Sequence, residues 1–138
     1  MSTFKVAINF GDGRFGLSKA ALTEYKTRIA TNQQKFNHYD YFNTSFRSDP
    51  ILIQIIEEMG LVANGDFARI VILTLDSKYK DCFNIYEYRG GENIVINKEK
   101  WLTNAIRSVT ENLKLSETEK LQKISDLYAE YDYYKNEE

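Results

Sequence analysis

A glycine-rich segment is the part of this sequence whose residue types and spacing come nearest to a ligand-binding motif. Gly11, Gly13 and Gly16 form a GxGxxG pattern between a strand-like run and a helix-like run. In dinucleotide-binding proteins, such glycines let the backbone approach a pyrophosphate at the positive end of a helix. The second parallel strand of that unit is missing here, and so is the acidic residue expected about twenty positions later. The pattern therefore favours a tight strand-to-helix turn over a dinucleotide site.

A weaker anion site at the same turn is a second hypothesis. Backbone N–H groups near Ser18, together with Arg14, could hold a phosphate at the start of the helix, and Arg47 is a second cationic candidate. Asp12 lies in the same turn and would repel an anion, although Arg14 can offset its charge.

A segment rich in aromatic residues, 36–47, is the other candidate surface. It combines Phe, Tyr and His with amide side chains and an arginine. Such side chains anchor protein interfaces, and they can also stack on bases. A cluster folded over the sheet is the alternative, because several of these rings must be buried to escape water. The candidate binding residues of the two segments are Arg14, Phe15, Ser18, His38, Tyr41, Phe42 and Arg47.

The remaining reactive side chains do not form a recognisable catalytic group. His38 is the sole histidine and has no cysteine near it, so a closed zinc site cannot be built there. Cys82 lacks a nearby base. Glu87 and Glu92, like other paired acids in the chain, are interpreted as solvated surface carboxylates. We therefore expect binding rather than catalysis, with no metal and no cofactor.

Length, charge and cysteine content limit the class of protein. The chain has 138 residues, a formal net charge of −2 and one cysteine. It is long enough for a single domain with its own core, and the lone cysteine favours a reducing compartment such as the cytoplasm. No run of residues is apolar enough to span a membrane, and the charge disfavours duplex nucleic acid as a partner. The tyrosines of the C-terminal end are interpreted as the buried edge of the last helix, and a contact in a homo-oligomer is the alternative; they are Tyr128, Tyr131, Tyr133 and Tyr134.

Three successive strand signals are expected to form the centre of the fold. Residues 67–75 are almost continuously apolar, which predicts a central strand with both faces covered. Residues 83–88 and 92–96 flank Gly90 and Gly91, a pair that can supply the positive φ angles of a tight hairpin. Residues 5–10 provide a further strand.

Four helices are expected around this sheet. Ser18 and Asp49 have the composition of N-caps, and Gly60 is placed to end the second helix. Asn97 and the Ser116 capping box begin a C-terminal helical hairpin. The sequence thus predicts an α+β fold, with a small antiparallel or mixed four-stranded sheet in the order β-α-α-β-β-β-α-α. Residues 1–138 are expected to form a single domain, with 31–48 as an irregular connection and 132–138 as a frayed tail.

Several short motifs together resemble a known group of proteins. They are Phe15-Gly16-Leu17-Ser18 after the first strand, Arg47-Ser48-Asp49-Pro50 before an Ile- and Leu-rich helix, Asn64-Gly65, and Ile85-Tyr86-Glu87-Tyr88. Over roughly residues 4 to 97, the chain is similar to a family of small uncharacterised proteins encoded by bacteriophages and large DNA viruses. Family members carry a Tyr-Gly-Gly-type step before Phe-Gly-Leu-Ser, from which Asp12 and Arg14 depart.

The resemblance implies a viral or phage accessory protein without supplying a mechanism, and the C-terminal helical hairpin lies outside it. Combined with the residue analysis, it predicts a non-enzymatic protein that binds a host or viral protein through the aromatic segment and the glycine-rich turn. The alternative is a protein that binds a small anionic ligand, a nucleotide or phosphate, and that acts against host defence.

Overall fold

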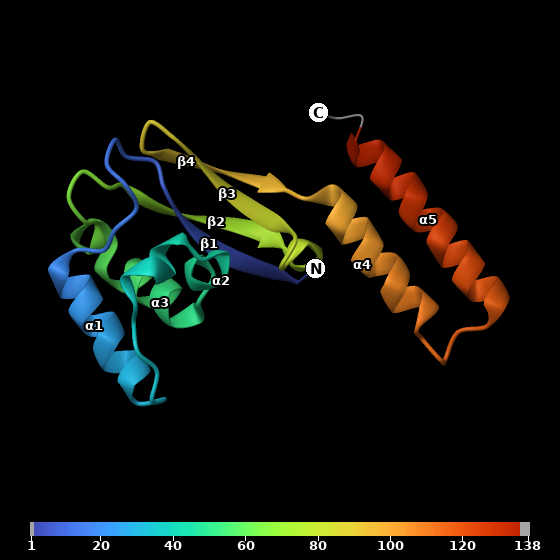
Figure 1. The fold of residues 1–138 in the computed structure, drawn as a ribbon, viewed down its shortest axis with the longest axis horizontal. Coiled ribbons are helices and arrows are strands. Elements are labelled where there is room, and N and C mark those ends of the chain that lie inside the picture. Colours follow the sequence, from blue (N-terminus) through green and yellow to red (C-terminus); the bar gives the residue numbers. More distant parts are fainter. Residues whose placement is uncertain (1, 136–138) are drawn as a thin grey trace. The chain divides into compact units, whose positions relative to one another are not determined.

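The structure, a computed structural model, describes residues 2–135 and has an α+β fold (Figure 1). The chain divides into two compact units, of which the first ends at Val95 and the second begins at Ile96. The predicted α+β class, with four strands and a C-terminal helical pair, is confirmed. The strands, however, lie in two separate two-stranded sheets instead of one.

The first sheet pairs strands that are distant in the sequence. β1 (Thr3–Asn9) runs antiparallel to β2 (Ile70–Asp76), with Val6 opposite Leu73. The prediction of a central strand over residues 67–75 is wrong in two respects. β2 pairs with β1 alone, and Ile70 is its only buried residue. The strand also begins after Phe67, which has a positive φ of 60° that interrupts the extended backbone.

The second sheet is the predicted hairpin of β3 (Phe83–Tyr88) and β4 (Gly91–Ile96). Its turn is displaced by one residue from the expected glycine pair, because Arg89 and Gly90 have the positive φ angles, 53° and 87°. A short 3₁₀ helix, Ser77–Tyr79, separates this hairpin from β2. The hairpin is a sheet of its own and does not pair with β1 or β2.

Local capping signals place the two longer helices of the first unit correctly. α1 (Lys19–Ala30) starts where the Ser18 hydroxyl accepts a hydrogen bond from the Ala21 N–H. α3 (Pro50–Met59) starts where the Asp49 carboxylate accepts from the Ile51 N–H. Gly60, with a φ of 59°, ends α3 as predicted, and a 3₁₀ helix, Gly60–Ala63, follows.

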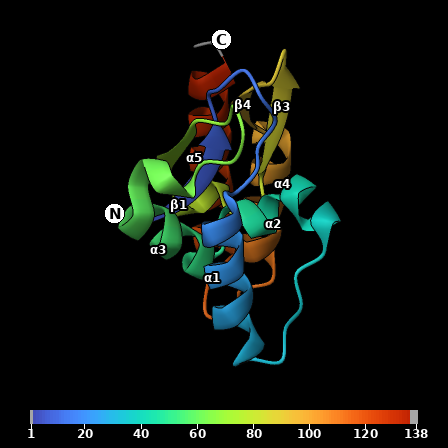
Figure 2. The ribbon, with the colours of Figure 1, turned by 90° about the vertical axis from the view of Figure 1, so that its left-hand side faces the viewer.

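The connection between α1 and α3 contains short helices rather than the expected irregular chain. A 3₁₀ helix, His38–Phe42, is followed by α2 (Thr44–Arg47). Asn37 and Asn43 cap them by accepting hydrogen bonds from backbone N–H groups two residues on, each at 3.0 Å. Figure 2 shows the chain returning alongside α1 to reach these helices. Helices of four and five residues are too short to give a readable hydrophobic period.

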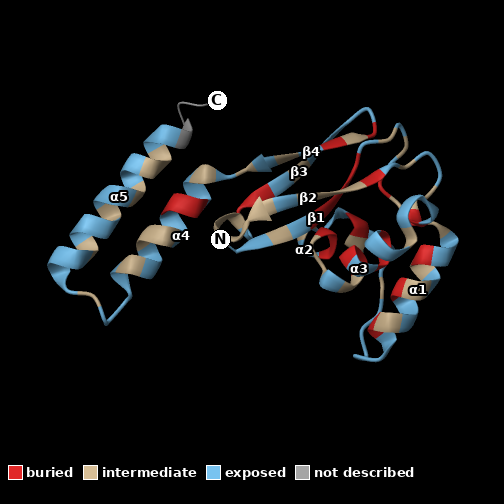
Figure 3. Ribbon diagram, turned by 180° about the vertical axis from the view of Figure 1, so that it is seen from behind, coloured by how far each residue is buried: buried red, intermediate tan, exposed pale blue. Residues whose placement is uncertain are grey.

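The core of the first unit lies between the β1–β2 sheet and its helices. α1, α2 and α3 lie on one side of this sheet in Figure 1, and the buried residues concentrate on α1, α3 and β1 in Figure 3. Leu52 and Ile55 of α3 have no exposed surface, and Tyr25 and Ile29 of α1 pack in the same cluster. These apolar side chains therefore form the buried faces of α1 and α3.

The second unit is the predicted helical hairpin of α4 (Lys98–Thr110) and α5 (Glu117–Lys135). Asn97 caps α4, and Ser116 and Glu119 form the expected capping box of α5. None of the α5 side chains that the structure describes is buried. The helix continues through Lys135, so it includes much of the segment expected to fray, and residues 136–138 lie outside the described residues.

Candidate functional site

A cavity of about 260 Å³ lies where the glycine-rich segment, the short helices of residues 38–47 and the β3–β4 hairpin come together. The residues that line it are Arg14, Phe15, Gly16, Leu17, His38, Tyr41, Phe42, Arg47, Gly65, Asp66, Glu87 and Glu92. All of the binding residues predicted from the sequence line this cavity except Ser18. The two segments that the sequence singled out therefore meet at one place.

An ion pair between Arg47 and Glu92 forms one wall of the cavity. The guanidinium donates from Nη1 to Oε1 at 2.7 Å and from Nη2 to Oε2 at 2.8 Å, a two-point arrangement. Its Nε donates to the Tyr41 carbonyl at 2.8 Å. The two side chains are only 4% and 6% exposed. The interpretation of Glu92 as a solvated surface acid is thus wrong, because long-range folding brings it beside a buried arginine.

The same ion pair also forms hydrogen bonds with main-chain groups at one end of the free edge of β1. Glu92 Oε1 accepts a hydrogen bond from the Asn9 N–H at 2.7 Å, and Arg47 Nη1 donates to the Ala7 carbonyl at 3.2 Å. Main-chain groups that a neighbouring strand would otherwise satisfy are therefore bonded to side chains.

Asn9 holds the loops around the cavity together, a role that the sequence analysis did not identify. Its side chain is completely buried. The amide nitrogen donates to the carbonyls of Gly13 and Gly90, and the amide oxygen accepts from the N–H groups of Gly11 and Arg69. All four hydrogen-bonding positions of the amide are filled. Its only signal in the sequence was a polar residue directly after the apolar residues 6–8.

Gly11 and Gly13, the first two glycines of the GxGxxG pattern, allow close packing of backbone segments. A Cβ atom on Gly11 would meet the Phe67 carbonyl at 2.5 Å, and one on Gly13 would meet the Asp66 carbonyl at 2.8 Å. The Gly13 N–H donates to the Phe67 carbonyl, and the Leu17 N–H donates to the Tyr41 hydroxyl. These glycines therefore have a structural explanation that requires no bound pyrophosphate.

The aromatic residues of positions 36–46 divide into a buried group and an exposed group. Phe36, Tyr41 and Phe46 lie together, with ring centroids 5.1 to 5.8 Å apart, and belong to or pack on the core. Tyr39 and Phe42 are 76% and 67% exposed. The alternative of a cluster folded over the sheet therefore holds for the buried rings, and a role in binding stays a prediction for the exposed ones.

Tyr41 links the core to the cavity. Its ring is buried against Phe15 and Phe46, and burial raises the pKa of its phenol above the ordinary value. The hydroxyl therefore stays protonated at neutral pH. Its oxygen accepts from the Leu17 N–H at 3.3 Å, which leaves the hydroxyl proton able to bond to a group that enters the cavity.

The cationic and aromatic side chains that line the cavity differ in exposure and in how firmly they are held. The Arg47 guanidinium lies 3.6 Å from the centroid of the Phe15 ring and is fixed by its hydrogen bonds. Arg14 and His38 are exposed at the mouth of the cavity. Phe42 lines the cavity and is also largely exposed.

Two of the three groups that the anion hypothesis requires are engaged within the protein. Ser18 caps α1 with its hydroxyl and donates its N–H to the Ala63 carbonyl. Arg47 is paired with Glu92, and only Arg14 points its charge to solvent.

Cys82 is buried. Within residues 2–135, no group of three or more His, Cys, Asp or Glu side chains is arranged to hold a metal ion. In the same part of the chain, no helix is both long and apolar enough to cross a bilayer.

Comparisons with known proteins add no relative to this description. No protein-family model, curated protein sequence or solved structure matches the chain.

Proposed function

We propose that this protein is a non-enzymatic accessory protein that binds a protein partner through the cavity and the exposed aromatic residues beside it. The observation that carries the proposal is the exposure of Phe42 and Tyr39, 67% and 76%, on a segment that is otherwise anchored in the core. Aromatic side chains of this kind bury large areas at interfaces at low entropic cost, and they are frequent among the residues that dominate binding energy.

The packing of the segment that carries Tyr39 and Phe42 favours a binding surface that is formed before a partner binds. Both residues belong to the 3₁₀ helix His38–Phe42, which Asn37 caps. Tyr41 of the same helix packs on Phe46 of α2 in the core. Because the segment is already ordered, little conformational entropy is lost when a partner binds. Arg14 and His38 add polar groups at the cavity mouth, which matches the polar rim around an apolar centre that protein interfaces have.

The biological setting of the proposal rests on the sequence resemblance alone. It implies an accessory protein of a phage or a large DNA virus, which would act on a host or viral protein in the host cytoplasm. A small anionic ligand is less well supported, because Ser18 and Arg47 already have partners within the fold.

A capture experiment with matched variants tests the proposal. Wild-type protein, Phe42→Ala and Leu61→Ala would be immobilised and exposed to extract from the cells that make the protein. Leu61 is 82% exposed and lines neither this cavity nor the larger groove of the same unit, so it controls for general stickiness. We expect a partner that wild type and Leu61→Ala retain and Phe42→Ala loses. Equal capture by all three proteins would exclude this surface.

A further inference from the structure

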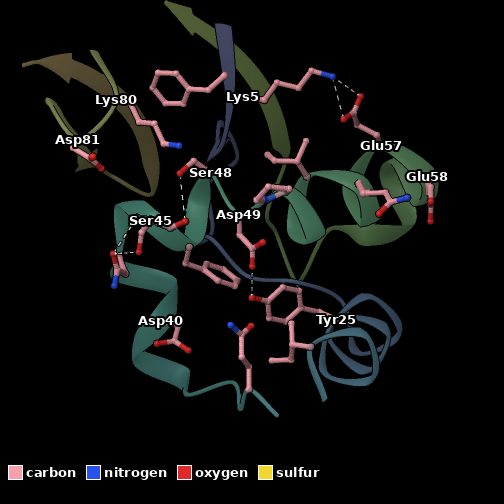
Figure 4. A pocket seen from close by; sticks show the side chains of 18 of the residues that line it. Lys5, Tyr25, Asp40, Ser45, Ser48, Asp49, Glu57, Glu58, Lys80 and Asp81 are labelled. Atoms are coloured by element: carbon pink, nitrogen blue, oxygen red, sulfur yellow. Dashed lines mark hydrogen bonds and ion pairs between the residues drawn. The ribbon is translucent and has the colours of Figure 1, made fainter. Parts of the chain in front are cut away.

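A groove of about 1250 Å³ on the first unit is separate from the cavity of the proposed function, and the two share no lining residue. It is bordered by the start of β1, by α1, α2 and α3, and by Lys80 and Asp81 (Figure 4). Thr3, Phe4 and Lys5 of β1 form one of its sides.

The hydrogen bonds of the first sheet identify which main-chain groups of β1 face β2. Phe10 N–H donates to the Arg69 carbonyl at 2.8 Å, and Ser77 N–H donates to the Ser2 carbonyl at 3.1 Å. Both pairs continue the register in which Thr3 lies opposite Asp76. Since alternate residues of an antiparallel strand bond to opposite sides, the even-numbered residues of β1 bond to β2. The odd-numbered residues therefore direct their N–H and C=O groups to the other edge.

That other edge is closed at only one end. The Ala7 carbonyl and the Asn9 N–H are bonded to Arg47 and Glu92. Thr3 and Lys5 belong to the same row, and within residues 2–135 their main-chain groups make no hydrogen bond along this edge. Both residues are exposed and line the groove. The edge is therefore an open template for another strand.

We propose that an extended peptide segment of a partner protein, carrying basic side chains, adds as a strand along Thr3–Lys5 and occupies the groove. Unpaired N–H and C=O groups at the spacing of a β-strand select an extended backbone rather than a helix, because only an extended chain repeats donors and acceptors at that interval. The groove then receives the side chains of the added strand. This site goes beyond the proposed function and does not depend on it.

The charge of the groove favours basic side chains on the peptide. Its acidic residues outnumber its basic ones, which are Lys5, Lys35 and Lys80. Lys5 and Glu57 neutralise each other at 3.0 Å, and Arg28 pairs with Glu58 at 2.7 Å. The acids that remain are Asp40, Asp49 and Asp81, against Lys35 and Lys80. Figure 4 shows acidic side chains at several positions around the groove, namely Asp40, Asp49, Glu57, Glu58 and Asp81. Lys or Arg side chains would complement this arrangement.

A variant pair isolates the main-chain contact. Lys5→Pro removes the outward N–H but leaves the bonds between β1 and β2, because that N–H does not face β2 and proline is tolerated at a strand edge. Lys5→Thr removes the same charged side chain and keeps the N–H. The probe is a library of random ten-residue peptides displayed on phage and selected on the wild-type full chain. We expect selected peptides rich in Lys or Arg that bind Lys5→Thr normally and Lys5→Pro at least tenfold more weakly.

Amide hydrogen exchange of the wild-type protein gives a second test, which does not depend on whether a variant folds. In the free protein we expect the Lys5 amide to exchange much faster than the Val6 amide, and we expect Lys5 to become protected at least tenfold when a selected peptide is bound. Equal protection of Lys5 and Val6 in the free protein would overturn the proposal. So would protection that grows with protein concentration, since a second copy would then occupy the edge. Failure to select any peptide whose binding depends on the Lys5 N–H would also overturn it.

Discussion

Arg47 and Glu92 are 45 residues apart in the sequence, yet they form a two-point ion pair whose side chains are 4% and 6% exposed. The pair connects α2 to β4 and satisfies main-chain groups of β1. The residues that line the cavity are therefore positioned by a buried polar network, with Asn9 at its other end.

Breaking this ion pair is expected to destabilise the fold strongly. Arg47→Met leaves the Glu92 carboxylate buried without its cation, which should lower the free energy of unfolding by about 3–5 kcal/mol. Lys5→Met is the control, because the Lys5–Glu57 pair is about half exposed and should contribute less than about 1 kcal/mol. Urea unfolding of both variants measures the difference. Similar losses for the two would show that burial does not distinguish the pairs.

Gly90 and Gly91 are expected to respond differently to alanine. Gly90 has a φ of 87°, and a Cβ there would overlap the Asp12 carbonyl of the glycine-rich segment. For Gly91 the nearest atom to such a Cβ is the Tyr88 carbonyl oxygen, at an ordinary 3.6 Å. Gly90→Ala should therefore lower the free energy of unfolding by more than about 1–2 kcal/mol, and Gly91→Ala should lower it clearly less. Thermal unfolding of the two variants would decide, and equal melting temperatures would contradict the packing that is described.

The features that could be predicted from the sequence are those encoded within a few residues. Ser18, Asp49, Asn97 and Ser116 each cap the helix that follows, because a capping side chain bonds to backbone N–H groups two or three positions away. The hairpin around Gly90 is local in the same sense. The sequence indicated two separate candidate segments, and their convergence on one cavity was not predicted; the residues that converge are Arg14, Phe15, His38, Tyr41, Phe42 and Arg47.

The features that were missed depend on partners distant in the sequence. Nothing near Glu92 in the chain indicates that it will meet Arg47 and the Asn9 N–H, 83 residues away. The division of the strands into two sheets is likewise a result of which edges meet in the folded chain. The division of the aromatic segment into buried and exposed rings could not be predicted from the sequence for a different reason. Its helices have four or five residues, which is too short for a hydrophobic periodicity to show which side is buried. The expectation of a single domain stays a prediction.

Tyr25 should make the free energy of unfolding of the protein depend on pH in the alkaline range. Burial, and secondly the 2.6 Å hydrogen bond that its hydroxyl donates to Asp49, raises the pKa of this phenol well above its ordinary value. A raised folded-state pKa gives stability that is complete below the unfolded value, near pH 10, and that is lost as the pH rises toward the folded value.

Tyr25→Phe is the variant that reveals this dependence. We expect it to be about 1.5 kcal/mol less stable than wild type between pH 6 and pH 9, and we expect the difference to shrink above about pH 10. The other tyrosines are common to both proteins, so their ionisation cancels in the comparison. Urea unfolding at several pH values measures the difference, and one that stays constant to pH 11 would refute the assignment.

Phe46 and Phe42 should show the two roles of the aromatic segment. Phe46 is 6% exposed and lies in the core, so Phe46→Ala should lower the free energy of unfolding by about 3–5 kcal/mol. Phe42 is 67% exposed, so Phe42→Ala should change the unfolding free energy by less than about 0.5 kcal/mol. Denaturant unfolding gives both values. A large loss for Phe42→Ala would place that ring in the core and remove it from the binding surface.

Photo-cross-linking is the most direct test of the proposed binding surface. The photoreactive residue p-benzoylphenylalanine would replace Phe42 in one sample and Leu61 in another, and each protein would be irradiated in extract from the cells that make it. The account predicts a discrete cross-linked protein product from position 42 that is absent from position 61. Irradiation that gives no product from position 42, or the same products from both positions, would contradict it.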